Sequence, residues 1–193
     1  MKTTFEISKF KSFKEALKFR NQYPDFQSAW KNCERGDWML CLTQILEVDE
    51  RKLTLAKGLC ANIVRYLMTD ERSVKAVDAA IAFGNGEIDE EMLKKAAIDA
   101  EEVFLSEKRI TANSIAVAYA AYAAYAAYAA AATHASHAAA THASHAYATH
   151  AYATHAKTKS IATYSSSRLA NLKQTSDICR EILTEEVFKK LEI

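Results

Sequence analysis

The sequence predicts an all-α fold, and three observations support that prediction. Glycine and proline, the residues that disfavour helices most, occur only 4 times and once among 193 residues. Alanine, which has the highest helix propensity, is used heavily. Apolar residues recur at helical spacing in the first half of the chain, and no run of four or more alternating residues predicts a strand.

Length and composition favour one globular unit. Half of the residues are apolar and 25% are charged, an ordinary ratio for a domain that buries its own core. We therefore expect residues 1–193 to form a single all-α domain, a bundle of about seven to ten helices. The 25 basic and 24 acidic side chains nearly cancel, so no net field favours binding to nucleic acid or to an anionic membrane.

The cysteines and the N-terminus predict a cytoplasmic protein. Cys33, Cys41, Cys60 and Cys179 are scattered, without a C-x-x-C pair, which favours buried free thiols over a disulfide framework or a zinc site. The first 19 residues carry charges throughout and lack the apolar run of a signal peptide.

Capping residues divide the first half of the chain into helices. Aspartate and serine favour the N-terminal end of a helix, whereas glycine and proline favour its C-terminal end. These preferences predict a capping box at Ser12–Glu15, a stop at Pro24, a cap at Asp25, a junction where Gly36 ends one helix and Asp37 begins the next, caps at Asp49 and Asp70, a turn at Gly84–Gly86 and a cap at Asp89.

The second half contains no glycine or proline after Gly86, so helix ends there must be predicted from polar residues. Candidate boundaries are Asn113, Ser165–Ser167 and Thr175–Asp177. The last segment, Asp177–Leu191, is expected to form one or two short helices.

A low-complexity tract of Ala, Tyr, His and Thr occupies residues 115–156. One helix over the whole tract would be about 65 Å long, whereas a compact chain of this size has a diameter of roughly 40 Å. We therefore expect the tract to break between Ala131 and Thr149, where a Thr or Ser can cap a second helix, and to form a central helical hairpin.

Part of this tract could be considered as a membrane span. Ile115–Ala132 is a stretch of 18 uncharged residues, long enough to be examined as a span. Alanine contributes little to membrane insertion, and the four tyrosines would lie at mid-bilayer instead of at the interfaces. A buried helix, with no membrane contact, is the better interpretation.

All six histidines lie in the same tract and raise the question of a metal site. His134 with His137, and His142 with His145, could each supply a pair of ligands at i, i+3 spacing. However, the eight-residue repeat advances roughly 80° around a helix, which moves successive pairs off one face. No carboxylate lies between Lys108 and Ser176 to complete a site. We predict no dedicated metal site and a fold that loosens at low pH if several histidines are buried.

No catalytic motif is evident. Arg35-Gly36-Asp37 spells an integrin tripeptide, but between two tryptophans it is better interpreted as a helix junction. No phosphate loop, nucleophile elbow or paired-carboxylate site appears. We therefore expect no catalytic residues and no cofactor.

Three stretches nevertheless match one pattern: NCERGDWML (Asn32–Leu40), RKLTLAKGLCANIV (Arg51–Val64) and DERSVKAVDAAIAFGNGEI (Asp70–Ile88). Together they resemble the immunity proteins of bacterial polymorphic toxin systems, in the immunity-protein-five-like branch. That family combines a C-x-R-G-D-W segment with an R-K-L helix and a D-x-R helix that closes in G-E. An Ala- and His-rich stretch follows, which is longer and more repetitive here.

The resemblance implies an all-helical cytoplasmic protein that neutralises a cognate toxin by binding it. The matching motif residues are Cys33, Arg35, Gly36, Asp37 and Trp38. We interpret them as a structural junction in which Arg35 can form an ion pair. The alternative hypothesis is a helical protein that binds a metal or small ligand through its His-rich hairpin.

Overall fold

The computed structural model describes residues 14–106, 123, 138–154 and 161–193, and every regular element within these ranges is a helix. The all-α bundle predicted from composition is therefore confirmed. Its elements are α2 (Lys14–Arg20), α3 (Phe26–Asn32), α4 (Gly36–Ile45), α5 (Glu50–Asn62), the 3₁₀ helix η2 (Arg65–Leu67), α6 (Glu71–Gly84), α7 (Glu90–Ser106), α9 (Ala138–Thr154) and α10 (Ile161–Leu191).

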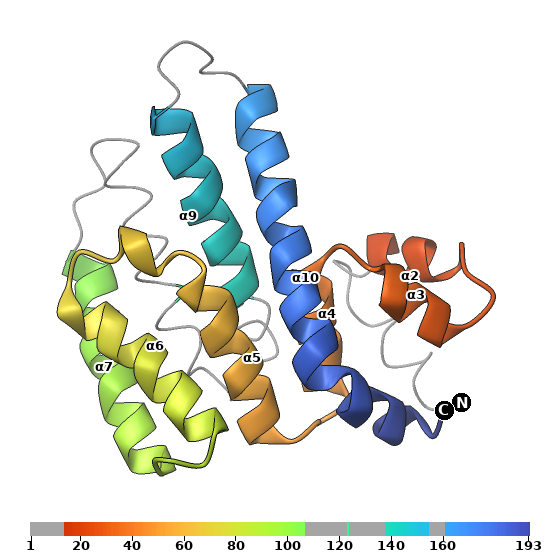
Figure 1. The fold of residues 1–193 in the computed structure, drawn as a ribbon, viewed down its shortest axis with the longest axis horizontal. Coiled ribbons are helices and arrows are strands. Elements are labelled where there is room, and N and C mark those ends of the chain that lie inside the picture. Colours follow the sequence, from red (N-terminus) through yellow and green to blue (C-terminus); the bar gives the residue numbers. More distant parts are fainter. Residues whose placement is uncertain (1–13, 107–122, 124–137, 155–160) are drawn as a thin grey trace.

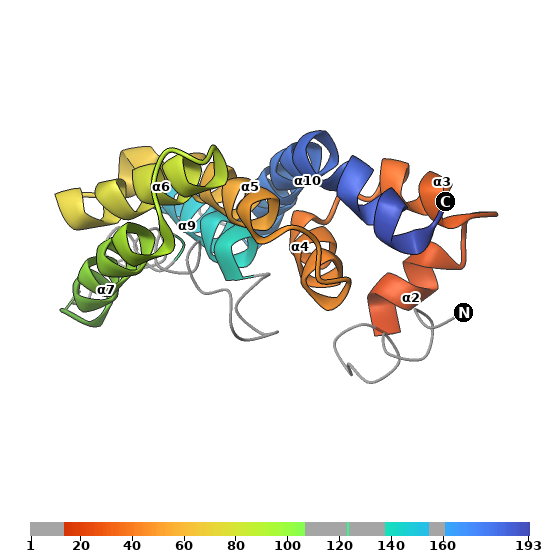
Figure 2. The same cartoon turned by 90° about the horizontal axis from the view of Figure 1, so that it is seen from below.

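The long helix α10 organises the bundle. It contacts α9, α4 and α5 along its length, and α3 near its C-terminal end. On the far side of α5 the chain continues into α6 and α7, so that α7, α6, α5 and α10 follow one another across the molecule (Figure 1). Figure 2 shows α2 and α3 at the opposite end from α7, beside the C-terminal end of α10.

Two main apolar clusters hold these helices together. The first joins α3, α4, α5 and α10 through large side chains, including Trp30, Leu40 and Leu183. The second joins α5, α6 and α9 mainly through small ones, including Ala61, Ala143 and Ala146. Since alanine lets helix backbones approach closely, α9, the described helix of the Ala-rich tract, serves here as a packing surface.

The predicted aspartate caps are confirmed. The side chains of Asp25, Asp49, Asp70 and Asp89 accept hydrogen bonds of 2.6, 3.0, 2.9 and 2.9 Å from backbone amides in the first turns of α3, α5, α6 and α7. Each such cap stabilises its helix by about 1 kcal/mol. The cap locations follow from local sequence because only local groups are involved.

The predicted role of Gly36 is wrong. α3 ends at Asn32, and Gly36 is the first residue of α4 instead of the end of the preceding helix. Asp37 accordingly lies in the first turn of α4 and is not its N-cap. Glycine is required at position 36 for a different reason, because a Cβ there would lie 2.2 Å from the Thr175 Oγ1 atom of α10.

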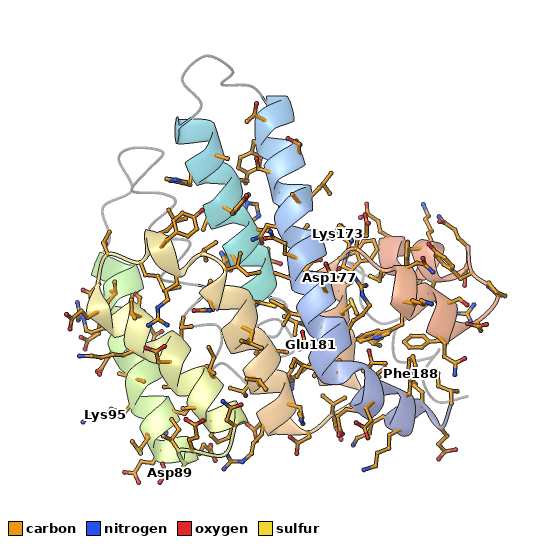
Figure 3. All side chains as sticks on the ribbon, in the orientation of Figure 1. Asp89, Lys95, Lys173, Asp177, Glu181 and Phe188 are labelled. Carbon is orange, nitrogen blue, oxygen red and sulfur yellow. The ribbon has the colours of Figure 1, made fainter. Side chains whose placement is uncertain are left out.

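The predicted boundaries at Ser165–Ser167 and Thr175–Asp177 are also wrong, because α10 runs through both as one 31-residue helix. The hydroxyls of Ser166, Thr175 and Ser176 donate to carbonyls three residues earlier, at 3.1, 2.8 and 2.7 Å. Bonded in this way, the hydroxyls do not compete with the helix for its amides. Figure 3 shows Lys173, Asp177 and Glu181 following one another along α10, and all three are exposed.

Part of the window predicted for a break in the Ala-rich tract is wrong. α9 is continuous from Ala138 to Thr154, which excludes a break between Ala138 and Thr149. Its main packing partner among the described helices is α10, on the C-terminal side of the tract. The first arm of the predicted hairpin lies outside the described residues, except for Ala123, which is helical and buried in the α5–α6–α9 cluster.

Within the described ranges, no helix is both long enough and apolar enough to cross a membrane. The candidate span Ile115–Ala132 lies outside those ranges apart from Ala123.

The contact at Gly36 predicts that Gly36→Ala destabilises the fold by about 2 kcal/mol or more, because the added methyl group overlaps Thr175 and the helices must separate. Thermal or urea unfolding measures the loss. Gly86→Asn is the matched control: its φ of +83° suits asparagine and no atom lies within 4 Å of an added Cβ. Equal losses in the two variants would contradict this account of Gly36.

Candidate functional site at the junction of α3, α4 and α10

The residues Cys33–Trp38 form the corner between α3 and α4, and an ion pair closes it. The Arg35 guanidinium donates from Nε to Asp37 Oδ1 at 2.8 Å and from Nη2 to Asp37 Oδ2 at 2.6 Å. The side chain of Asp37 is only 7% exposed, against 27% for Arg35. The ion pair expected for Arg35 is therefore present, with its acidic partner inside the protein.

Arg35 also covers an aromatic ring. Its guanidinium carbon lies 4.2 Å from the ring centroid of Trp38, in a cation–π arrangement. Burial disfavours the charge of Arg35, but the hydrogen bonds and the attraction of Asp37 outweigh this effect and raise the pKa of Arg35. The side chain therefore stays charged and fixed between Asp37 and Trp38.

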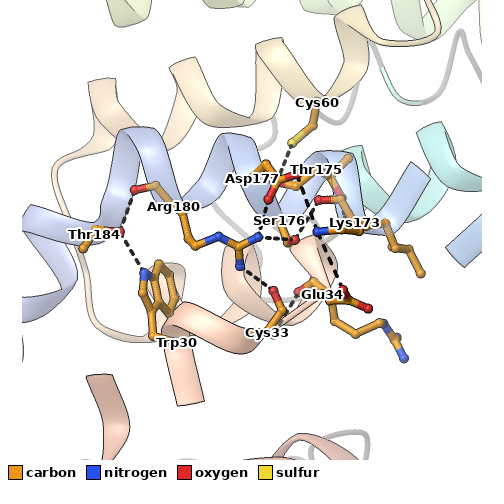
Figure 4. A network of polar contacts seen from close by, with 12 residues as sticks. Trp30, Cys33, Glu34, Cys60, Lys173, Thr175, Ser176, Asp177, Arg180 and Thr184 are labelled. Carbon is orange, nitrogen blue, oxygen red and sulfur yellow. Dashed lines mark hydrogen bonds and ion pairs between the residues drawn. The ribbon is translucent and has the colours of Figure 1, made fainter. Parts of the chain in front are cut away.

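Arg180 of α10 attaches the corner to the C-terminal helix (Figure 4). Its Nη1 donates to the carbonyl oxygen of Cys33 at 2.6 Å, and its Nη2 donates to Ser176 Oγ at 3.0 Å and to the carboxylate of Asp177. The carbonyl of Cys33 lies where α3 has ended and no helix supplies a donor. The guanidinium of Arg180 thus supplies the donor for the carbonyl oxygen of Cys33, which has no partner within the helices of the corner.

Further contacts on both sides of Arg180 strengthen this attachment. The indole Nε1 of Trp30 donates to Thr184 Oγ1 at 2.9 Å. The ammonium group of Lys173 lies 3.6 Å from a carboxylate oxygen of Glu34. In Figure 4 these contacts follow one face of α10. Arg180 was not singled out from sequence, because a lone arginine on a charged helix gives no indication of its partner.

The cysteines of this region are free and buried, as predicted. Burial raises the pKa of the Cys33 thiol and raises that of Cys41 to about 12. Cys179 and Cys60 donate weakly to the carbonyls of Gly36 and Thr175, at 3.8 and 3.9 Å. Thiols held in the protonated form are poor nucleophiles, so the side chains of Cys33 and Cys41 are better suited to packing than to nucleophilic attack.

The other two matching segments also contribute to helix junctions. Arg51 at the start of α5 donates to the carbonyl of Phe83 and lies 4.3 Å from the centroid of the Phe83 ring, at the end of α6. Arg72 donates to both carboxylate oxygens of Asp70, the residue that caps α6, at 3.0 and 2.8 Å. One arginine from each of the three segments therefore lies at a different helix end.

The described histidines lie on α9, and two of them contact neighbouring elements. His145 Nδ1 bonds to the Tyr164 hydroxyl of α10, and His150 meets the ring of Tyr66 edge-on at 5.6 Å. The ring centroids of His142 and His145 are 6.5 Å apart. Among the described residues no three potential ligands are grouped around one point. His134, His137 and His155 lie outside the described residues.

His145 links the tract to the corner electrostatically. Burial lowers its pKa, the positive charge of Arg168 lowers it further, and Asp37 acts in the opposite direction. Nearby on α10, Asn171 is fully buried and neither atom of its side-chain amide has a hydrogen-bond partner in the described part of the chain. Sequence reasoning missed the buried Asn171 because a polar residue within a helix usually lies on its exposed face.

The ion pair of the corner predicts that Asp37→Asn costs about 1–3 kcal/mol of stability, because Arg35 loses the charge that compensates its burial. Chemical unfolding measures the loss. The bidentate ion pair of Arg65 with Asp78 is the matched control. The side chains of these two residues are 39% and 54% exposed. Solvent screens that pair, so Asp78→Asn is expected to cost less than about 1 kcal/mol. A larger loss at Asp78 than at Asp37 would contradict the assignment.

Because burial lowers the pKa of His145, we expect the free energy of unfolding to fall with acidification. Its pKa in the folded protein is lowered, so as pH drops below about 6.5 the unfolded chain binds a proton that the folded chain resists. The melting temperature should therefore decrease from about pH 8 to about pH 5.5. His145→Gln removes this titration and should reduce the decrease. A wild-type melting temperature that is flat over this range would refute the prediction.

Comparison with models of protein families, with curated proteins and with solved structures finds no match to this chain.

Proposed function

We propose that this protein is a binding protein that neutralises a cognate protein toxin, as an immunity protein of a bacterial polymorphic toxin system. The proposal starts from the resemblance of Asn32–Leu40, Arg51–Val64 and Asp70–Ile88 to that family. It includes a cytoplasmic location and no catalytic activity.

One observation supports binding over catalysis. Three arginines of the matching segments are engaged at helix ends: Arg35 with Asp37, Arg51 with the end of α6, and Arg72 with Asp70. An enzyme family would be expected to keep its characteristic polar residues together around one reacting group. Residues that instead fix helix ends suit a protein whose purpose is to present a rigid surface.

The proposal predicts that a neighbouring gene encodes a toxin-like C-terminal domain, and co-expression with that domain tests it. We expect the chain to restore growth of cells that produce this domain, and to elute with it as one complex in gel filtration. The control is a toxin domain from an unrelated system, which should remain toxic. Failure to protect, together with separate elution of the two proteins, would overturn the proposal.

A further inference from the structure

An open pocket lies at the end of the molecule formed by α2, α3, α4 and the last residues of the chain. Its volume is about 470 Å³, within the range of pockets that hold small molecules. It borders the α3–α4 corner, whose Cys33 and Trp38 both contribute to its lining.

Two pairs of aromatic rings line the pocket. Phe19 meets Trp38 edge-on with centroids 6.1 Å apart, and Phe26 stacks on Trp30 at 6.1 Å. The only polar group of the Trp30 ring already donates to Thr184, so this ring offers an apolar face. Rings held in contact with one another form a preshaped apolar wall, which favours an apolar ligand over water.

The polar lining is confined to the end of α2. Arg20 and Asn21 line the pocket there. Within the described part of the chain the exposed guanidinium of Arg20 forms neither a hydrogen bond nor a salt bridge, although its charge acts on the nearby carboxylate of Asp25. The nearby carboxylate of Asp25 is committed to capping α3, with a bond of 2.6 Å from the Ser28 amide. The forked donors of an arginine match the two oxygens of a carboxylate.

From this combination we propose that the pocket binds a small amphiphilic carboxylate, whose hydrocarbon part lies among the four aromatic rings and whose carboxylate pairs with Arg20. The proposal does not depend on toxin binding. It assigns a ligand class to a pocket in which apolar walls supply most of the affinity and one cation orients the ligand.

The two tryptophans of the chain both line the pocket, so intrinsic fluorescence reports directly on its occupancy. The full-length protein is titrated with decanoate, decanol and decyltrimethylammonium, each below its micelle concentration. We expect saturable changes, with decanoate bound about five-fold more tightly than decanol and the cationic amphiphile bound most weakly.

Two variants test the role of Arg20. Arg20→Gln should make the affinities for decanoate and decanol equal without changing the melting temperature. Lys18→Gln, an exposed cation on the same helix that does not line the pocket, should leave the preference intact. A third variant, Ala16→Leu, narrows the pocket and should lower the affinity for all three ligands.

Several outcomes would overturn the proposal. One is the absence of saturable binding of any of the three ligands, and another is equal affinity for all of them. Light scattering that shows a dimer which dissociates on Ala16→Leu would assign the pocket to a second copy of the chain. A third result would assign the pocket to the partner protein: Ala16→Leu no longer protects against the toxin, and the wild type does not bind decanoate.

Discussion

The close approach of α4 to α10 at Gly36 and Thr175 is the constraint on which the other contacts of the bundle depend. With no side chain at position 36, the start of α4 lies against α10, and the carbonyls of Gly36 and Cys33 come within reach of Cys179 and Arg180. The carbonyl of Thr175 in turn accepts from Cys60 of α5. One short stretch of α10 therefore locates both α4 and α5.

Close packing of this kind leaves polar groups inside the protein. Lys57 on α5 is fully buried, and burial lowers its pKa to about 8. Asn171 is equally buried on α10, the helix that packs against α9. Small side chains bring backbones together but supply little apolar volume, so the longer polar side chains of neighbouring helices are enclosed as well. The acid sensitivity expected from His145 is one consequence of this enclosure.

Local features could be predicted from sequence, and tertiary ones could not. The four aspartate caps and the turn at Gly86 depend on groups within a few residues, and each was predicted correctly. Gly36 was assigned to a helix end because glycine usually ends helices, whereas its neighbour Thr175 is distant in sequence. The serines of α10 suggest boundaries because sequence does not show that their hydroxyls bond to the preceding turn. For the candidate site, the Arg35–Asp37 pair was within reach of sequence reasoning, but Arg180 and the aromatic pocket were not.

The same short stretch of α10 that locates α4 and α5 also holds the α3–α4 corner through Arg180, and native-state hydrogen exchange of wild type and Arg180→Met tests this attachment most directly. The amide of Met39, which donates to the carbonyl of Arg35 at 3.1 Å, reports on the first turn of α4. Exchange at this amide and its neighbours in α4 should accelerate in the variant, while the amides of α6 and α7 keep their protection. Unchanged protection of α4, or an equal loss of protection across all helices, would contradict the account.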